Sequence, residues 1–148
     1  MELFIGMKRF SMVLYHIEEN EQVMKLAHIK EILRAEVITG DDQLDMTLEA
    51  GTASDLMSDM LTGYNTDTVL LTGLCNAQVI RTSVIAGVKA IVFVRRKRPS
   101  PEVVQLAVNH HLPLLSTAFT MFSSCGRLFA QGLRGVEGRV SNRVDAPD

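Results

Sequence analysis

The chain of 148 residues lacks tryptophan and has only two tyrosines. Few aromatic rings are therefore available to stack on bases, which argues against a protein that binds single-stranded nucleic acid. The formal net charge of -2 also gives no general affinity for nucleic acid. No apolar run approaches the roughly 20 residues that a membrane-spanning helix needs, so no membrane partner is predicted.

Cysteine is scarce as well. Cys75 and Cys125 form neither a disulfide framework nor the paired spacing of a zinc site. No metal is predicted, and two reduced thiols favour a cytoplasmic chain. The N-terminus lacks a long apolar segment followed by an A-x-A-like cleavage site, so no signal peptide is expected.

The motifs that usually mark catalysis and cofactor binding are missing too. The chain has no G-x-x-x-x-G-K-[ST] phosphate loop, and no G-x-G-x-x-G sequence follows a strand-like run. It also lacks a G-x-S-x-G elbow. No nucleophile stands near a base and an orienting group in the sequence pattern. We therefore expect no enzyme, no catalytic residue and no cofactor.

One stretch, Asp67 to Gly87, organises the chain. Its apolar run over Thr68–Thr72 predicts a strand, and a small-residue turn begins at Gly73. The spacing of apolar residues over 76–86 then predicts a helix, which Gly87 ends. A strand, a tight turn and the start of a helix make a place where a ligand can bind.

The second half repeats this alternation. Apolar runs at 89–94 and 112–116 predict two more strands, followed by helices over 101–110 and 118–131. An earlier strand is predicted over 35–39. The later strands lack alternation, as expected when helices cover both faces of a parallel sheet. The predicted fold is thus α/β, a layered domain whose mainly parallel sheet (strands near 35–39, 68–72, 89–94 and 112–116) is flanked by helices.

The first half gives weaker signals. Helical spacing covers 25–33, and residues 44–53 alternate just enough to suggest an edge strand. Ser54 and Asp55 would cap a helix that runs through Leu61.

Three segments follow from these patterns. Residues 1–23 show no clean periodicity and are expected to form an N-terminal extension. Residues 24–133 form the α/β domain, and 134–148, rich in Gly, Arg, Ser, Asn and Asp, are expected to be a flexible tail.

The carboxyl ends of parallel strands share one edge of a sheet, and ligands bind there. Polar side chains, a glycine and two arginines follow three of the predicted strands, which suits a small anionic ligand. These candidates are Thr72, Gly73, Asn76, Arg95, Arg96, Ser116 and Thr117. The same pattern also fits a purely structural role, in which Asn76 and Thr117 cap helices and the basic run is solvated. Alternatively, the run from Arg95 to Arg98 could dock a nucleic-acid phosphate or an acidic partner.

Two further features have both a functional and a structural interpretation. Cys75 stands at a helix N-terminus, where the helix dipole would lower the thiol pKa, and it is our candidate for redox chemistry. A buried, inert thiol is the alternative. Asp55 and Asp59 lie four apart on the helix predicted there and could bind a metal, or could simply face solvent.

At this level of detail the chain from Lys25 to Leu133 resembles the DRTGG domain. The matching segments are Ile29–Gly40, Ala53–Asp59, Leu70–Leu74 with Gln78–Thr82, Ala90–Arg95, and Pro113–Thr117 leading to Met121 and Phe122. The stretch nearest to the name-giving string is Thr72-Gly-Leu-Cys-Asn76. The domain is also similar to the middle domain of phosphate acetyltransferases and to the N-terminal domain of HPr kinase/phosphorylase, whose kinase half is absent here.

The resemblance implies a regulatory or ligand-sensing α/β domain that forms homodimers and has no established catalysis. Together with the residues above, it favours a non-catalytic domain that binds a small anionic ligand or a partner protein at the strand ends. Two alternatives stay open: an interaction module without a small ligand, and a thiol switch that uses Cys75.

Overall fold

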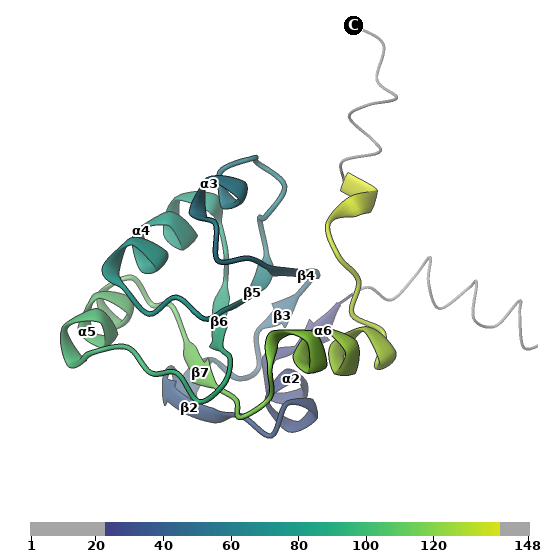
Figure 1. The fold of residues 1–148 in the computed structure, drawn as a ribbon, viewed down its shortest axis with the longest axis horizontal. Coiled ribbons are helices and arrows are strands. Elements are labelled where there is room, and N and C mark those ends of the chain that lie inside the picture. Colours follow the sequence, from purple (N-terminus) through teal and green to yellow (C-terminus); the bar gives the residue numbers. More distant parts are fainter. Residues whose placement is uncertain (1–22, 140–148) are drawn as a thin grey trace, which may run out of the picture.

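The computed structural model describes residues 23–139 and contains one main sheet of five strands (Figure 1). The strand order is β2–β7–β6–β5–β4. Strands β4 to β7 pair in parallel, whereas β2 runs antiparallel to β7 at the other edge. Their bounds are β2 Glu36–Thr39, β4 Ala50–Ala53, β5 Thr68–Thr72, β6 Ala90–Phe93 and β7 Leu114–Ser116. The prediction of an α/β fold with a mainly parallel sheet is confirmed.

A small antiparallel sheet stands beside the main one. It joins β1 (Met24–Lys25) to β3 (Thr47–Leu48), with Met24 opposite Leu48. Between these two strands the chain forms helix α2 (Leu26–Ile32), strand β2 and a short 3-10 helix, η1 (Asp41–Gln43). The described chain therefore begins next to the segment that leads into β4.

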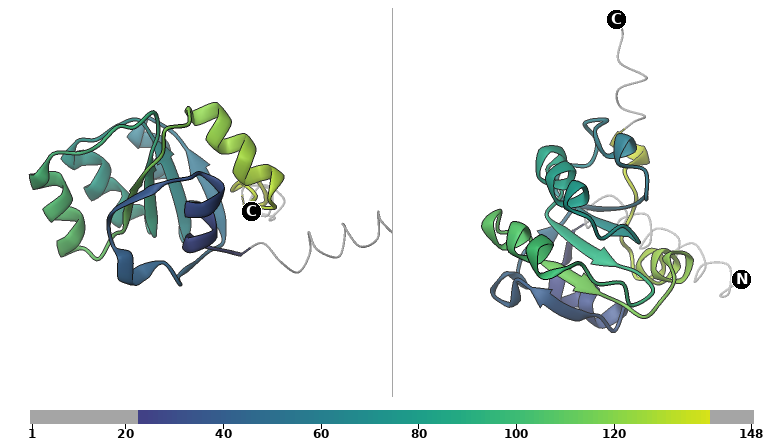
Figure 2. Two further views of the ribbon diagram at one scale, coloured as in Figure 1. Left: turned by 90° about the horizontal axis from the view of Figure 1, so that it is seen from below. Right: turned by 60° about the vertical axis from the view of Figure 1, so that its left-hand side comes forward.

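Helices cover both faces of the main sheet, as the two views of Figure 2 show. Helices α3 (Met57–Met60), α4 (Ala77–Ala86) and α5 (Pro101–Asn109) pack on one face, where the core includes Leu70, Ile91 and Phe93. Helices α2 and α6 (Met121–Ala130) pack on the other. There the core includes Val69, Leu71, Val92 and Leu128. Successive residues of a strand thus enter opposite cores, which explains the uninterrupted apolar runs.

Helix α4 shows how the sequence sets its bounds. The Asn76 side chain accepts a hydrogen bond from the Val79 N–H at 3.1 Å, which satisfies one free donor of the first turn. Gly87 ends the helix in the left-handed conformation, with φ of 80°. Helix α5 begins with Pro101, whose missing N–H is not needed at the first helical position.

Three local predictions need correction. The last helix begins at Met121, because the Thr120 side chain rather than that of Thr117 accepts from a first-turn N–H, that of Ser123. Residues 44–53 form two short strands, β3 and β4, instead of one. The helix predicted after Ser54 is a single turn, because the Ser54 hydroxyl accepts from Leu56 N–H and holds the chain in a turn there.

The ends of the chain were predicted to be an extension and a tail. Residues 1–22 of the extension and 140–148 of the tail lie outside the described residues. Residues 134–139 are described and contact the sheet edge, since the Gly51 N–H donates to the Arg134 carbonyl at 2.9 Å. Within residues 23–139 no helix is long and apolar enough to cross a membrane.

Candidate functional site

The loops after β4, β5, β6 and β7 meet at one edge of the sheet, because these four strands run in parallel. The candidate ligand-binding residues come from three of these loops, so the fold does bring them to one edge. Their side chains nevertheless have different roles.

The hydroxyl groups of the candidate ligand-binding residues form hydrogen bonds within the protein. Thr117 is buried and donates to the Leu33 carbonyl at 2.7 Å, which ties β7 to the end of α2. Ser116 is also buried and donates to the Lys97 carbonyl at 3.0 Å. Both hydroxyls therefore stabilise the loops, and they do not point into a site.

The turn after β5 holds a carboxylate that the sequence analysis did not place there. Asp55 Oδ1 accepts from the Thr72 hydroxyl and from the Gly73 N–H, each at 2.8 Å. Thr72 Oγ1 in turn accepts from Leu74 N–H at 3.1 Å. Because Asp55 already uses the Gly73 N–H and carries a negative charge, an anion is disfavoured at this turn.

A signal for Asp55 was present in the sequence. Asp55 follows the weak strand pattern of 44–53, and the strand-end rule would have selected it had that strand been counted as parallel. The proposed pair with Asp59 on a helix face is wrong, since the helix begins only at Met57. In the part of the chain that the structure describes, no three His, Cys, Asp or Glu side chains form a metal site.

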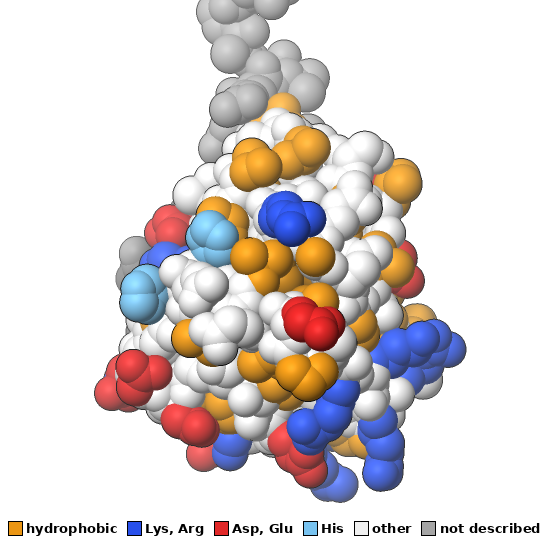
Figure 3. Space-filling model, turned by 90° about the vertical axis from the view of Figure 1, so that its left-hand side faces the viewer, with side chains coloured by type: hydrophobic (Ala, Val, Ile, Leu, Met, Phe, Trp, Pro, Cys, Tyr) orange, Lys and Arg blue, Asp and Glu red, His pale blue; other side chains and the backbone are white. Residues whose placement is uncertain are grey.

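The loop after β6 presents four exposed cations, Arg95 to Arg98. Arg95 and Arg96 both have positive φ, 54° and 58°. Their N–H groups donate to the Phe119 carbonyl at 2.9 Å and the Thr117 carbonyl at 2.7 Å, so the backbone is fixed. Figure 3 shows Lys and Arg side chains gathered at the lower right of the molecule in that view.

The four cations differ in their partners. Arg98 pairs with Glu36 of β2. Arg95, Arg96 and Lys97 have no ion-pair partner among residues 23–139. The guanidinium groups of Arg95 and Arg96 therefore stay exposed on a fixed backbone at the strand ends.

Cys75 lies on the same edge, in the turn before α4. Burial raises the pKa of its thiol, Lys97 lowers it, and Asp55 raises it further. The expected lowering by the helix dipole is thus wrong in direction. Burial also raises the pKa of Cys125, and both cysteines are free. At neutral pH the thiol form of Cys75 dominates, which disfavours a fast nucleophile or redox switch.

The charges around Cys75 make its reactivity tunable. In a Cys125→Ser background, Asp55→Asn should lower the Cys75 pKa and speed its alkylation severalfold at pH 8, since the thiolate is the reactive form. Lys97→Ala should raise the pKa and slow the reaction. The pH-rate profile checks this: its midpoint should lie above that of an exposed thiol and should shift in opposite directions in the two variants. Asp59→Asn is the control, and an equal effect there would contradict the role of Asp55.

Comparison with known families identifies the family to which this chain belongs. The sequence profile of the DRTGG domain matches residues 28–129, more than two thirds of the chain. The chain belongs to the DRTGG domain family. The match includes the loops after β4, β5 and β6, so Asp55, Cys75 and the basic loop are all part of the family domain.

A solved structure shares this DRTGG fold. It contains the CBS and DRTGG domains of the regulatory region of Clostridium perfringens pyrophosphatase, complexed with its activator, diadenosine tetraphosphate. Sequence identity is 18% and the TM-score is 0.58, over 74% of this chain and 47% of that one. The chain thus spans about half the length of that region. No curated protein matches the chain significantly.

Proposed function

We propose that this DRTGG domain is a non-catalytic regulatory domain of the cytoplasm that binds a small polyphosphate-like anion at the loop of Arg95 and Arg96. The observation that carries the proposal is the pair of consecutive left-handed arginines at the carboxyl ends of the strands. Among the described residues, no other non-glycine pair in sequence has positive φ.

This backbone conformation is costly for arginine. A left-handed residue with a Cβ is disfavoured by roughly 1–2 kcal/mol, so glycine would be the cheaper choice at both positions. Strain of this kind is often kept where side chains have a function. The strain is held by the bonds to Phe119 and Thr117, so two exposed arginines stand on a fixed loop. Such groups form paired, charge-assisted hydrogen bonds with phosphate oxygens.

The kind of anion is suggested by the solved relative. Its regulatory region was crystallised with diadenosine tetraphosphate, a ligand with several phosphates in a row. The sequence identity of 18% supports only a shared fold, so the ligand is carried over here as a hypothesis. Asp55 would keep such an anion away from the Gly73 turn and towards the basic loop, because like charges repel.

Calorimetric titration of the full chain with pyrophosphate, ATP and diadenosine tetraphosphate tests the proposal. We expect at least one ligand to bind, and Arg95→Ala to weaken its Kd about tenfold or more, because a charged hydrogen bond is worth roughly 1.5–3 kcal/mol. Lys89→Ala is the matched control, since Lys89 pairs with Asp67 at the amino-terminal end of the strands. Absence of binding by wild-type protein, or equal losses in both variants, would contradict the proposal.

We also infer that the domain forms a homodimer through the face made by α4 and α5. This face is turned to the viewer in Figure 3, which shows hydrophobic side chains across its middle. Ile85 of α4 is 77% exposed, and Val84 and Val108 are exposed as well. Clustered apolar side chains on a surface favour a protein interface.

Sedimentation analysis checks the dimer. Ile85→Glu should shift wild-type dimers to monomers, because a carboxylate would be buried without a partner in the interface. Ser123→Glu adds the same charge to an exposed position on α6, which packs on the other face of the sheet, and should leave the mass unchanged. Should wild-type protein sediment as a monomer, this face would not be a self-association surface.

A further inference from the structure

A groove of about 450 Å³ lies along the outer edge of the sheet, away from the basic loop. Strand β4 forms its first wall, α6 its second, and the chain after α6 its third. The lining residues are Gly51, Thr52, Ala53, Leu71, Cys125, Leu128, Phe129 and the segment Leu133–Glu137. Most of these side chains are apolar or small.

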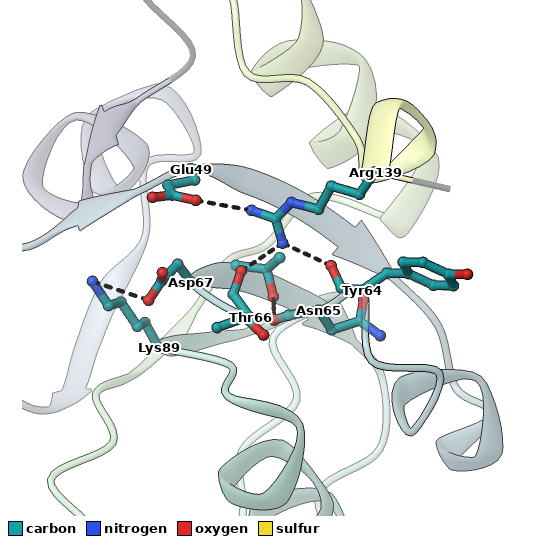
Figure 4. A network of polar contacts seen from close by, with 8 residues as sticks. Glu49, Tyr64, Asn65, Thr66, Asp67, Lys89 and Arg139 are labelled. Carbon is teal, nitrogen blue, oxygen red and sulfur yellow. Dashed lines mark hydrogen bonds and ion pairs between the residues drawn. The ribbon is translucent and has the colours of Figure 1, made fainter. Parts of the chain in front are cut away.

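The third wall is a segment that we call the C-terminal strap, residues 133–139. Its first part lies against the β4 edge, because the Arg134 carbonyl accepts a hydrogen bond from the Gly51 N–H. Leu133 is close as well, since a Cβ at Gly51 would lie 3.0 Å from its Cδ2 atom. Its last part is anchored by Arg139 (Figure 4). The strap is thus held at both ends, and the groove has a fixed shape.

The anchor at Arg139 has three acceptors. Its guanidinium donates to the carbonyls of Tyr64 and Thr66 at 2.7 and 2.6 Å, and it pairs with Glu49 at 3.1 Å. Glu49 immediately precedes β4, and the two carbonyls belong to the loop before β5. The strap therefore bridges the two strands at that edge of the sheet.

The groove leaves apolar surface open to solvent. Phe129 is 59% exposed although it forms part of the wall, and Ala53 of the edge strand is exposed. Burial of such surface is favourable by roughly 25 cal/mol per Å², so an apolar segment would gain free energy by entering the groove.

The position where the described chain begins indicates which segment could fill the groove. Met24 pairs with Leu48, and β4 begins two residues after Leu48. Met24 also packs in the same core cluster as Leu128 and Leu133, which line the groove. Val23, the first described residue, is exposed and precedes Met24, whose partner Leu48 lies three residues before Gly51 of the groove.

The sequence before Val23 carries suitable side chains. Met12-Val-Leu-Tyr15 is a continuous apolar run, and the acidic run Glu18–Glu21 separates it from Val23. An extended chain rises about 3.3 Å per residue, so the eight residues from Tyr15 to Val23 can span up to about 27 Å. The four residues of β4 extend only about 13 Å at that rise. The segment between Val23 and the run is therefore, when extended, about twice as long as β4.

We propose that the apolar run Met12–Tyr15 of the same chain docks into the groove between β4, α6 and the C-terminal strap. This contact would tie the N-terminal extension to the edge of the sheet that lies outside the ligand loop. It does not depend on the proposed ligand.

The two native cysteines allow a direct test by disulfide trapping in the full chain. Within one chain of a Cys75→Ser, Leu14→Cys variant, the new thiol can pair only with Cys125 of the groove when diamide is the oxidant. A Cys125→Ser, Leu14→Cys variant is the matched control, because Cys75 packs against the core on the opposite face of the sheet. We expect a disulfide within one chain in the first variant and a yield several times lower in the control.

A second pair of variants tests the groove itself. Phe129→Ser should lower the yield of the trapped disulfide severalfold, whereas Phe122→Ser should not, since Phe122 is 89% exposed on α6 but does not line the groove. Circular dichroism confirms that both variants fold. Equal yields with Cys125 and Cys75 would overturn the proposal, as would a disulfide between position 14 of one chain and Cys125 of another, which would assign the groove to a second copy.

Discussion

Replacing Gly40 with alanine is expected to destabilise the protein by about 3 kcal/mol, the sum of a left-handed backbone and an overpacked contact. Gly40 follows β2 and has φ of 97°. A Cβ there would lie 2.6 Å from Cβ and 2.8 Å from Cα of Pro113. Pro113 precedes β7, the partner of β2, and Thr39 stands opposite Leu114. Relief of the clash would pull β2 away from the sheet.

Urea denaturation measures this loss as a lower midpoint. Gly132→Ala is the matched control, since Gly132 has φ of 107° but no atom within 4 Å of the position of a Cβ. That variant should lose only the conformational part, about 1 kcal/mol. A similar loss in both variants would show that Pro113 yields easily and that close packing there contributes little.

Sequence patterns predicted the structure best where a single physical cause sets it. The strand predicted over 68–72 has the bounds of β5, because apolar residues fill both cores there and Gly73 ends the run. Helix α4 was placed well because Asn76 and Gly87 have side-chain chemistry that fits helix ends. The start of α6 was misplaced because Thr117 and Thr120 are equally good caps by type, and only tertiary contacts commit Thr117 to Leu33.

The candidate site was predictable as a place but not as a set of contacts. Parallel strands bring their ends to one edge by geometry alone, so the loops could be collected from the pattern. Partners far apart in sequence could not: Thr117 bonds a carbonyl 84 residues away, and Asp55 bonds Thr72 across 17 residues. The antiparallel direction of β2 was hidden for the same reason, since its pairing with β7 is set by the whole sheet.

Replacing both Arg95 and Arg96 with glycine should have two effects. It should raise the stability of the protein, and it should abolish the proposed ligand binding. Each glycine relieves a left-handed conformation, and we expect a gain of about 1 kcal/mol per site after the entropy of glycine is subtracted. The same exchange removes the two exposed guanidinium groups, so the Kd for a phosphate ligand should rise far more than tenfold, because charged hydrogen bonds are lost twice.

The Arg95→Ala, Arg96→Ala double variant separates the two effects. It removes the same charges but keeps the Cβ atoms that strain the backbone, so affinity should fall equally while the urea midpoint stays near that of the wild type. If the glycine variant is no more stable than the alanine variant, the loop is not strained and the argument from its conformation is lost. If stability rises without a loss of affinity, the strain is real but is not kept for the ligand. Opposite signs for stability and affinity are what we expect of a loop retained for function, because backbone strain is often kept where the side chains contribute to binding.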